Sequence, residues 1–202
     1  MAISLQKGQR IDLTKSNPGL TKVMIGLGWD PVSQSGGKGL LGGLFGGSSA
    51  PNVDCDASVI MLKNDKFVDK QNLIYFGNLK SNCKSVVHSG DNLTGDGDGD
   101  DEQIQIDLTQ VPQDVNKLVF VVNIYDCTRR KQDFGMIQNA FIRVVNQQNN
   151  QELVRFNLTD NYSGQTTLIT GELYRHGTEW KFAAVGEGTT DPGLQQIVQR
   201  YI

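Results

Sequence analysis

The sequence predicts an all-β protein, a β-sandwich of two antiparallel sheets with a short C-terminal helix. Its 202 residues are enough for one large all-β domain. Short segments rich in Val, Ile, Phe and Tyr recur along the chain, and many alternate polar with apolar residues. Gly, Asn and Asp separate these segments, as turn residues do in sandwiches. We therefore expect residues 1–202 to form a single domain.

About twelve short strands are expected from this pattern. Where polar and apolar residues alternate, one face of the strand points into the sandwich. The run Leu118–Val122 is apolar at every position, which favours a central strand with both faces covered. In chain order, the expected strands are Ile3–Leu5, Arg10–Leu13, Lys22–Leu27, Ser58–Leu62, Asn72–Phe76, Ser85–His88, Gln103–Leu108, Lys117–Tyr125, Ala140–Val145, Glu152–Leu158, Thr167–Arg175 and Trp180–Val185.

The helix is expected at the C-terminus. Asp191-Pro192 provides a start signal for it. An apolar stripe at helical spacing follows, which we expect to pack on the core and not to bind a partner. The stripe consists of Leu194, Ile197, Val198 and Tyr201.

A Gly/Ser-rich segment interrupts the strand pattern at residues 31–53. Its composition predicts a loop inserted into the domain. It contains no phosphate-binding G-x-x-x-x-G-K-[ST] pattern. Its large apolar residues either fold back onto the domain or form a docking surface for a partner or a membrane. These residues are Leu40, Leu41, Leu44 and Phe45.

The composition excludes several classes of protein. The formal net charge is −3 and the mean hydropathy is −0.35, and no apolar run approaches the ~18 residues of a membrane span. The N-terminus lacks the pattern of a signal peptide, so we expect a cytoplasmic protein. Three widely spaced cysteines without C-x-x-C argue against a disulfide framework or a zinc site. Basic residues cluster only at 129–131, so direct nucleic-acid binding is not expected.

The segment Gly90–Glu102, GDNLTGDGDGDDE, contains six carboxylates in thirteen residues. Such a cluster is either a solvated acidic turn or a site where a hard cation compensates the repulsion. An EF-hand does not fit, because Asp101 stands where that loop needs Gly and the alternating run Gln103–Leu108 is typical of a strand. A calcium site here would therefore be mounted on strands and take further ligands from elsewhere in the chain.

Other candidate ligands are Asp54 and Asp56, which flank Cys55 at the start of an apolar run. In a strand, both carboxylates project from one face while Cys55 points the other way. Paired carboxylates on one face need a cation or contact with water. The alternative interpretation is two exposed residues at a strand end. Asp30, which closes the run Lys22–Trp29, is a third candidate.

Several segments, in order along nearly the whole chain, resemble the TerD-like tellurium-resistance and stress proteins. They are Ser4–Gly8, Gly26–Asp30, Asp54–Ser58, Asn78–Ser81, Gly90–Glu102, Asp114–Lys117, Ile124–Asp126 and Asn139–Val145. The resemblance implies a calcium-binding β-sandwich of the cytoplasm, with two calcium ions near one end. The positions that match the family's calcium ligands are Asp30, Asp54, Asp56, Asn78, Asp91, Asn92, Thr94, Asp100, Asp101 and Glu102.

The main functional hypothesis is a stress protein that binds calcium and is not an enzyme. The ions would order the acidic segment and create a surface for other stress-resistance proteins, with the membrane surface as one place for that contact. His88 and His176 form no recognisable catalytic constellation. Two alternatives remain open. One is a metal-dependent phosphoester hydrolase that uses the same carboxylates, and the other is a small-ligand or nucleotide-binding module.

Overall fold

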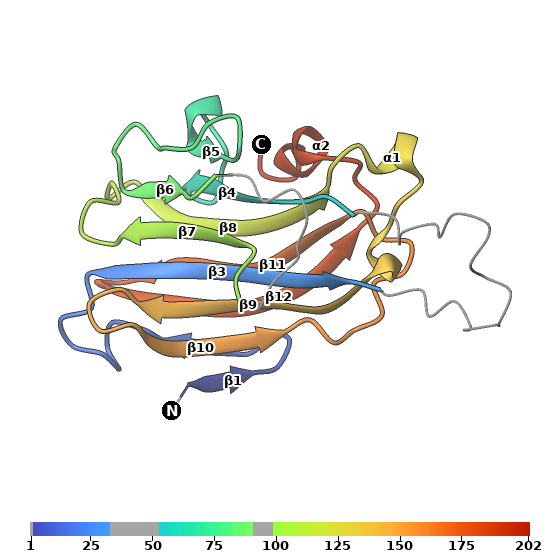
Figure 1. Ribbon diagram of the computed structural model, residues 1–202. Coiled ribbons are helices and arrows are strands. Elements are labelled where there is room, and N and C mark those ends of the chain that lie inside the picture. The colour runs from blue at the N-terminus through green and yellow to red at the C-terminus, as the bar shows by residue number, and fades with distance from the viewer. Residues whose placement is uncertain (1, 33–52, 91–98) are drawn as a thin grey trace, which may run out of the picture.

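Two six-stranded sheets stack face to face in the computed structural model, which describes residues 2–32, 53–90 and 99–202 (Figure 1). Sheet A has the strand order β1 (Ile3–Leu5), β10 (Gln151–Asn157), β9 (Ile137–Asn146), β3 (Lys22–Pro31), β7 (Glu102–Asp107) and β6 (Val86–His88). Sheet B has the order β2 (Arg10–Asp12), β12 (Glu179–Thr189), β11 (Thr167–His176), β8 (Val115–Ile124), β4 (Cys55–Lys63) and β5 (Leu73–Ile74).

Neighbouring strands are antiparallel, except that β1 pairs with β10 in parallel. The predicted sandwich of two antiparallel-dominated sheets is thus confirmed. The helical elements are short: η1 (Lys70–Asn72), α1 (Cys127–Arg130), η2 (Phe134–Met136) and α2 (Leu194–Gln199). Neither α-helix of the described residues has the length and apolar character that crossing a bilayer requires.

The main core lies between the two sheets. Alternate residues of the strands point into it, as the period of two predicts. Ile25 and Ile104 reach it from sheet A, and Phe120 and Phe182 reach it from sheet B, all of them inaccessible to solvent. Burial of these alternating apolar side chains holds the strands in register, because a slip by one residue would turn each of them outward.

A second, smaller core lies on the outer face of sheet B. Val119 and Val121 of β8 project there, whereas Leu118 and Phe120 project into the main core. This confirms that the apolar run of β8 is a central strand covered on both faces. The cover is α2, whose predicted apolar stripe packs as expected, with Ile197 fully buried.

The structure differs from the sequence predictions in two places. The strand expected at 72–76 is reduced to the two residues of β5, because Asp69 caps the 3-10 turn η1 that takes up Asn72. Helix α1 has four residues, too few for a periodic pattern in the sequence, and it lies between two left-handed residues, Asp126 and Lys131. The inserted segment 31–53 begins within β3, and residues 33–52 lie outside the described residues.

Replacing Phe120 with Ala should lower the free energy of unfolding by about 3–5 kcal/mol, because it leaves a cavity in the main core. Urea denaturation monitored by circular dichroism measures the change. Val68→Ala is the control, since Val68 is 60% exposed and its truncation should cost less than about 0.5 kcal/mol. Equal losses in the two variants would contradict this placement of the core.

Candidate metal centre

The described acidic candidates lie at one end of the sandwich, where β3 ends and β4 and β7 begin. Antiparallel pairing places Leu27 of β3 opposite Glu102 of β7. The backbone N–H of Asp101 donates to the carbonyl of Leu27 at 2.8 Å, which extends this pairing by one residue. The ladder therefore fixes where Asp101 and Glu102 lie relative to Asp30, near the end of β3.

Glu102 joins the two sheets at this end. Its side chain is 1% exposed, and Oε2 accepts a hydrogen bond from the backbone N–H of Ala57 in β4 at 2.6 Å. His88 of β6 reinforces the contact, because Nε2 lies 3.0 Å from the carbonyl of Ala57 and 3.3 Å from Oε2 of Glu102. Nδ1 of His88 accepts from the N–H of Gly90 at 3.0 Å. The sequence placed His88 in no catalytic constellation, and in the structure it is a buried support of the site.

Asp101 lies in a negatively charged environment. Its carboxylate accepts a hydrogen bond from the backbone N–H of Trp29 at 2.7 Å. Partial burial raises the pKa of Asp101, and the charges of Asp30, Asp100 and Glu102 raise it further, against the effect of the Trp29 hydrogen bond. The ionised form of Asp101 is thus disfavoured.

Asp54 and Asp56 approach the same place from β4. Asp56 is 3% exposed and pairs in register with Asn123 of β8. Between the two acids, Cys55 points into the main core, as predicted. Burial raises the pKa of the Cys55 thiol well above its usual range, and the carboxylates of Asp56, Asp54, Glu102 and Asp101 add to this effect, so all four lie within electrostatic range of the thiol.

Asn123 belongs to the site although the sequence analysis missed it. Its side-chain oxygen is buried and has no hydrogen-bond partner among the described residues. A buried amide oxygen without a donor is costly, and a cation beside Asp56 would satisfy it. The sequence carried a signal for this position, because Asn123 interrupts the apolar run that begins at Leu118.

Asp100 has a different environment. Its carboxylate is completely buried and accepts hydrogen bonds from Nε and Nη2 of Arg143 at 2.7 and 2.9 Å. Gln103 donates to it as well, at 3.1 Å. The carboxylate occupies the space over Gly26, where a Cβ atom would lie 2.2 Å from the nearest oxygen. Asp100 therefore anchors the end of the acidic segment to sheet A, with Gly26 making room for it.

The remaining predicted ligands divide into three groups. Asp30 accepts a hydrogen bond from the side-chain amide of Asn139 at 2.8 Å and contributes to the field at Asp101. Asn78 donates its amide to the carbonyl of Leu73 at 2.7 Å, within the turn that follows β5. The last group, Asp91, Asn92 and Thr94, lies outside the described residues.

The described carboxylates are close enough to influence one another, but they do not form a complete cage. Within residues 2–32, 53–90 and 99–202, no three His, Cys, Asp or Glu side chains are grouped tightly enough to hold an ion by themselves. Calcium requires roughly 6–8 oxygen ligands. A full coordination shell would therefore also need oxygens from the acidic segment.

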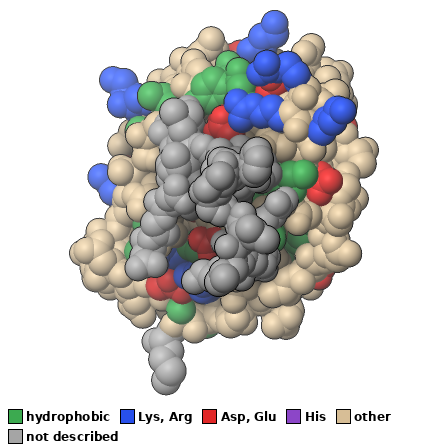
Figure 2. Space-filling view, turned by 45° about the vertical axis from the view of Figure 1, so that its right-hand side comes forward, with side chains coloured by type: hydrophobic (Ala, Val, Ile, Leu, Met, Phe, Trp, Pro, Cys, Tyr) green, Lys and Arg blue, Asp and Glu red, His purple; other side chains and the backbone are tan. Residues whose placement is uncertain are grey.

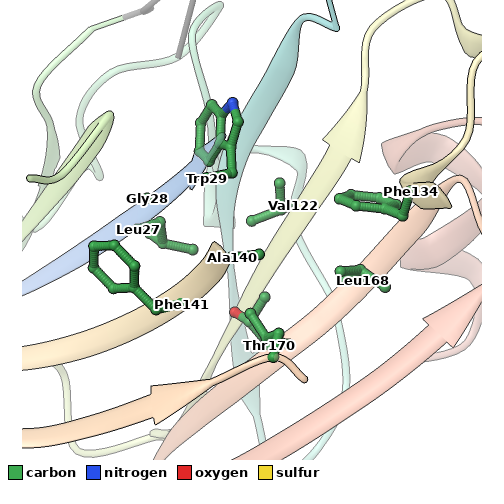
Figure 3. A pocket seen from close by; sticks show the side chains of 10 residues that line it. Leu27, Gly28, Trp29, Val122, Phe134, Ala140, Phe141, Leu168 and Thr170 are labelled. Atoms are coloured by element: carbon green, nitrogen blue, oxygen red, sulfur yellow. The ribbon is translucent and has the colours of Figure 1, made fainter. Parts of the chain in front are cut away.

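An apolar cavity lies just inside this end of the sandwich. It is lined by Leu27, Gly28, Trp29, Val122, Phe134, Ala140, Phe141, Leu158, Leu168 and Thr170. Figure 3 shows that the indole nitrogen of Trp29 points away from the other lining side chains. The hydroxyl group of Thr170 donates to the carbonyl of Phe120 at 3.2 Å. The cavity offers no acid, base or nucleophile to a substrate.

Comparison with known proteins identifies the family. Residues 1–201 match the TerD domain. The chain belongs to the TerD family. It is 70% identical over 202 residues to stress response protein SCP2 of Bacillus subtilis (strain 168), covering 100% of both chains. It is 43% identical to tellurium resistance protein TerD of Serratia marcescens, covering 100% of this chain and 97% of that protein.

The fold is also similar to a solved structure in the family. A homologue of telluride resistance protein (TerD) from Streptomyces coelicolor A3(2) superimposes with a TM-score of 0.64 at 20% identity. The match covers 86% of this chain and 94% of that one. The TerD resemblance found in the sequence is thus confirmed, both by the domain match and by the named relatives.

Arg143→Met should lower the free energy of unfolding by about 3–5 kcal/mol, because it leaves the buried carboxylate of Asp100 without its cation. Chemical denaturation at neutral pH measures the loss. Lys7→Met is the matched control, since Lys7 pairs with Asp160 on the surface and such pairs contribute about 0–1 kcal/mol. Similar losses in both variants would show that Asp100 is not held by Arg143.

Asp101→Asn should stabilise the TerD-family protein in a chelating buffer at neutral pH. The raised pKa of Asp101 means that the wild-type protein loses stability as the pH rises through that pKa, whereas Asn carries no charge and still accepts from Trp29. Below the ordinary Asp pKa of 3.8 the two proteins should be similar. Melting temperatures from acid to neutral pH test this, and a less stable variant at neutral pH would contradict it.

Proposed function

We propose that this TerD-family protein binds calcium and acts in cytoplasmic stress resistance as a metal-ordered interaction module, not as a catalyst. The observation that carries the proposal is the convergence of Asp56, Asp101 and Glu102 from two sheets, with Asp56 and Glu102 buried. Burying several like charges together costs free energy unless a cation compensates them. The names of the relatives supply the link to tellurium resistance and the stress response.

The donor set favours calcium over softer metals. Carboxylate and amide oxygens dominate it, and hard cations prefer such ligands. Cys55 points into the core and both ring nitrogens of His88 are engaged, so neither offers a soft ligand. We assign two calcium ions to Asp30, Asp54, Asp56, Asp101 and Glu102, to Asp91, Asn92 and Thr94 of the acidic segment, and to Asn123. Asp100 already pairs with Arg143, and the side chain of Asn78 donates to the carbonyl of Leu73, which favours a supporting role for both.

The proposal of a binding protein and not an enzyme is supported by the chemistry of the metal. Calcium polarises bound water weakly compared with zinc. The bound ions would instead supply positive charge that orders the acidic segment. Other stress-resistance proteins, including those at the membrane surface, are the partners that we propose for the ordered surface.

Calcium should raise the melting temperature of chelator-stripped protein, and Asp101→Asn should lose this response even though it starts from a more stable state. At calcium ~100-fold above its dissociation constant, one site contributes roughly 2.7 kcal/mol. Differential scanning calorimetry with calcium, and with magnesium as a second metal, measures the shift.

Asp107→Asn is the matched control for this experiment. Asp107 lies at the other end of β7, where Thr109, Gln110 and Lys22 contact its carboxylate. Hydrogen bonds from Thr109 and Gln110 lower the pKa of Asp107 despite partial desolvation. Removing the charge of this carboxylate in Asp107→Asn should therefore destabilise the protein slightly. The calcium response should stay intact. If wild-type protein shows no calcium response, the carboxylates are not a calcium site. If calcium stimulates phosphoester hydrolysis that Asp101→Asn abolishes, the protein is a hydrolase.

A further inference from the structure

An exposed group of aromatic rings lies beside the candidate metal centre. Phe76, in the turn after β5, is 41% exposed, and Tyr125, directly after β8, is 45% exposed. The ring centroids of Phe76 and Tyr125 lie 6.3 Å apart in an edge-to-face arrangement, and Tyr75 contacts Phe76 edge-to-face at 5.3 Å. The rings therefore support one another while Phe76 and Tyr125 remain partly exposed to solvent.

Basic side chains flank these rings. Helix α1 begins two residues after Tyr125 and contains Arg129 and Arg130, with Lys131 directly after it. The guanidinium of Arg130 lies 5.2 Å from the centroid of the Tyr125 ring. We call Phe76, Tyr125, Arg129, Arg130 and Lys131 the aromatic–basic patch. Figure 2, which faces the end of the molecule with α1, shows basic side chains around hydrophobic ones at the upper edge and acidic side chains below them.

The patch is connected to the carboxylates through Asp54. The backbone N–H of Tyr125 donates to the carbonyl of Asp54 at 2.8 Å. Nη1 of Arg130 lies 3.3 Å from Oδ2 of the same residue. Arg130 thus contacts a proposed calcium ligand and an exposed aromatic ring at the same time.

We propose that the aromatic–basic patch is a docking surface for an acidic polypeptide segment that carries an apolar or aromatic side chain. Basic groups attract the carboxylates of such a segment, and the rings of Phe76 and Tyr125 accept its apolar side chain. Tyr, Phe and Arg are also the residue types enriched in the centres of protein interfaces.

The charge distribution favours a narrow segment over an anionic membrane. The whole protein has a formal net charge of −3, and its carboxylates lie directly beside the patch. Screened charges act over about 10 Å at 0.1 M salt, so a flat anionic bilayer would meet these carboxylates together with the basic residues. A narrow polypeptide segment meets fewer of these carboxylates than a flat bilayer does, namely Asp54 and Asp126, which pair with Arg130 and Arg129.

Calcium regulates this docking, an inference that rests on the proposed function. In the structure, the carboxylate of Asp54 partly neutralises Arg130. An ion on Asp54 removes this competing charge, and two divalent ions change the formal net charge from −3 to about +1, since four charges are added. The affinity for an acidic segment should therefore rise when calcium binds.

The test uses fluorescence anisotropy with a short, dye-labelled Glu-rich peptide that has one central Phe. Wild-type protein should bind it in calcium, more weakly in chelator and more weakly at high salt. Phe76→Ala should reduce the affinity roughly tenfold while keeping the calcium-induced rise in melting temperature. Arg130→Gln should also weaken binding, whereas Arg10→Gln should not. Arg10 also lies over a tyrosine, Tyr174, but on the strand β2 at the opposite edge of sheet B.

The outcomes separate the two proposals. In one outcome, wild-type protein melts higher in calcium but does not bind the peptide. In another, the Phe76→Ala variant binds the peptide as tightly as wild-type protein does. Either result would overturn the docking surface and leave the calcium function standing. Binding to phosphatidylglycerol vesicles in place of the peptide would overturn it too. Peptide binding that depends on Phe76 but not on calcium would support the surface and overturn its regulation.

Discussion

The buried carboxylate of Glu102 is the contact on which the arrangement of this end depends. Glu102 belongs to β7 of sheet A and accepts a hydrogen bond from the backbone of Ala57 in sheet B, so a polar contact ties the two layers. His88 completes the contact from β6. Because Asp101 precedes Glu102 and Asp56 precedes Ala57, this one hydrogen bond also fixes the distance between the acidic residues of the two sheets.

The adjacent residues Asp100 and Asp101 have opposite electrostatic environments. Asp100 lies over Gly26 and is neutralised by Arg143, which in turn contacts Glu152. Asp101, the next residue, is surrounded by other carboxylates. Arg143 thus compensates the residue that anchors the segment, whereas partial burial and the neighbouring carboxylates disfavour the ionised form of Asp101. A carboxylate that already pairs with an arginine contributes less to metal affinity than one in a negatively charged environment.

The period of two in the sequence was sufficient to predict the sandwich, the central position of β8 and the inward direction of Cys55, because burial of alternate residues is a local property of a strand. The partners of the acids were not predictable in this way. Arg143 meets Asp100, and His88 meets Glu102, only through the register of strands distant in sequence. The Asn123 amide interrupts an apolar run, and this polar residue could have been recognised in the sequence as a candidate ligand. Helix α1 is too short to give a helical pattern in the sequence.

The pairing of the first two strands has a consequence for how the chain folds. Ile3 of β1 lies opposite Val154 of β10, and Asp12 of β2 lies opposite Lys181 of β12, so each sheet gains this edge strand only after a partner far along the sequence is available. Contacts so distant in sequence slow folding, because the intervening chain must first be ordered. On the ribosome, β1 and β2 therefore stay unpaired until β10 and β12 have been synthesised, and their apolar residues stay exposed during that interval.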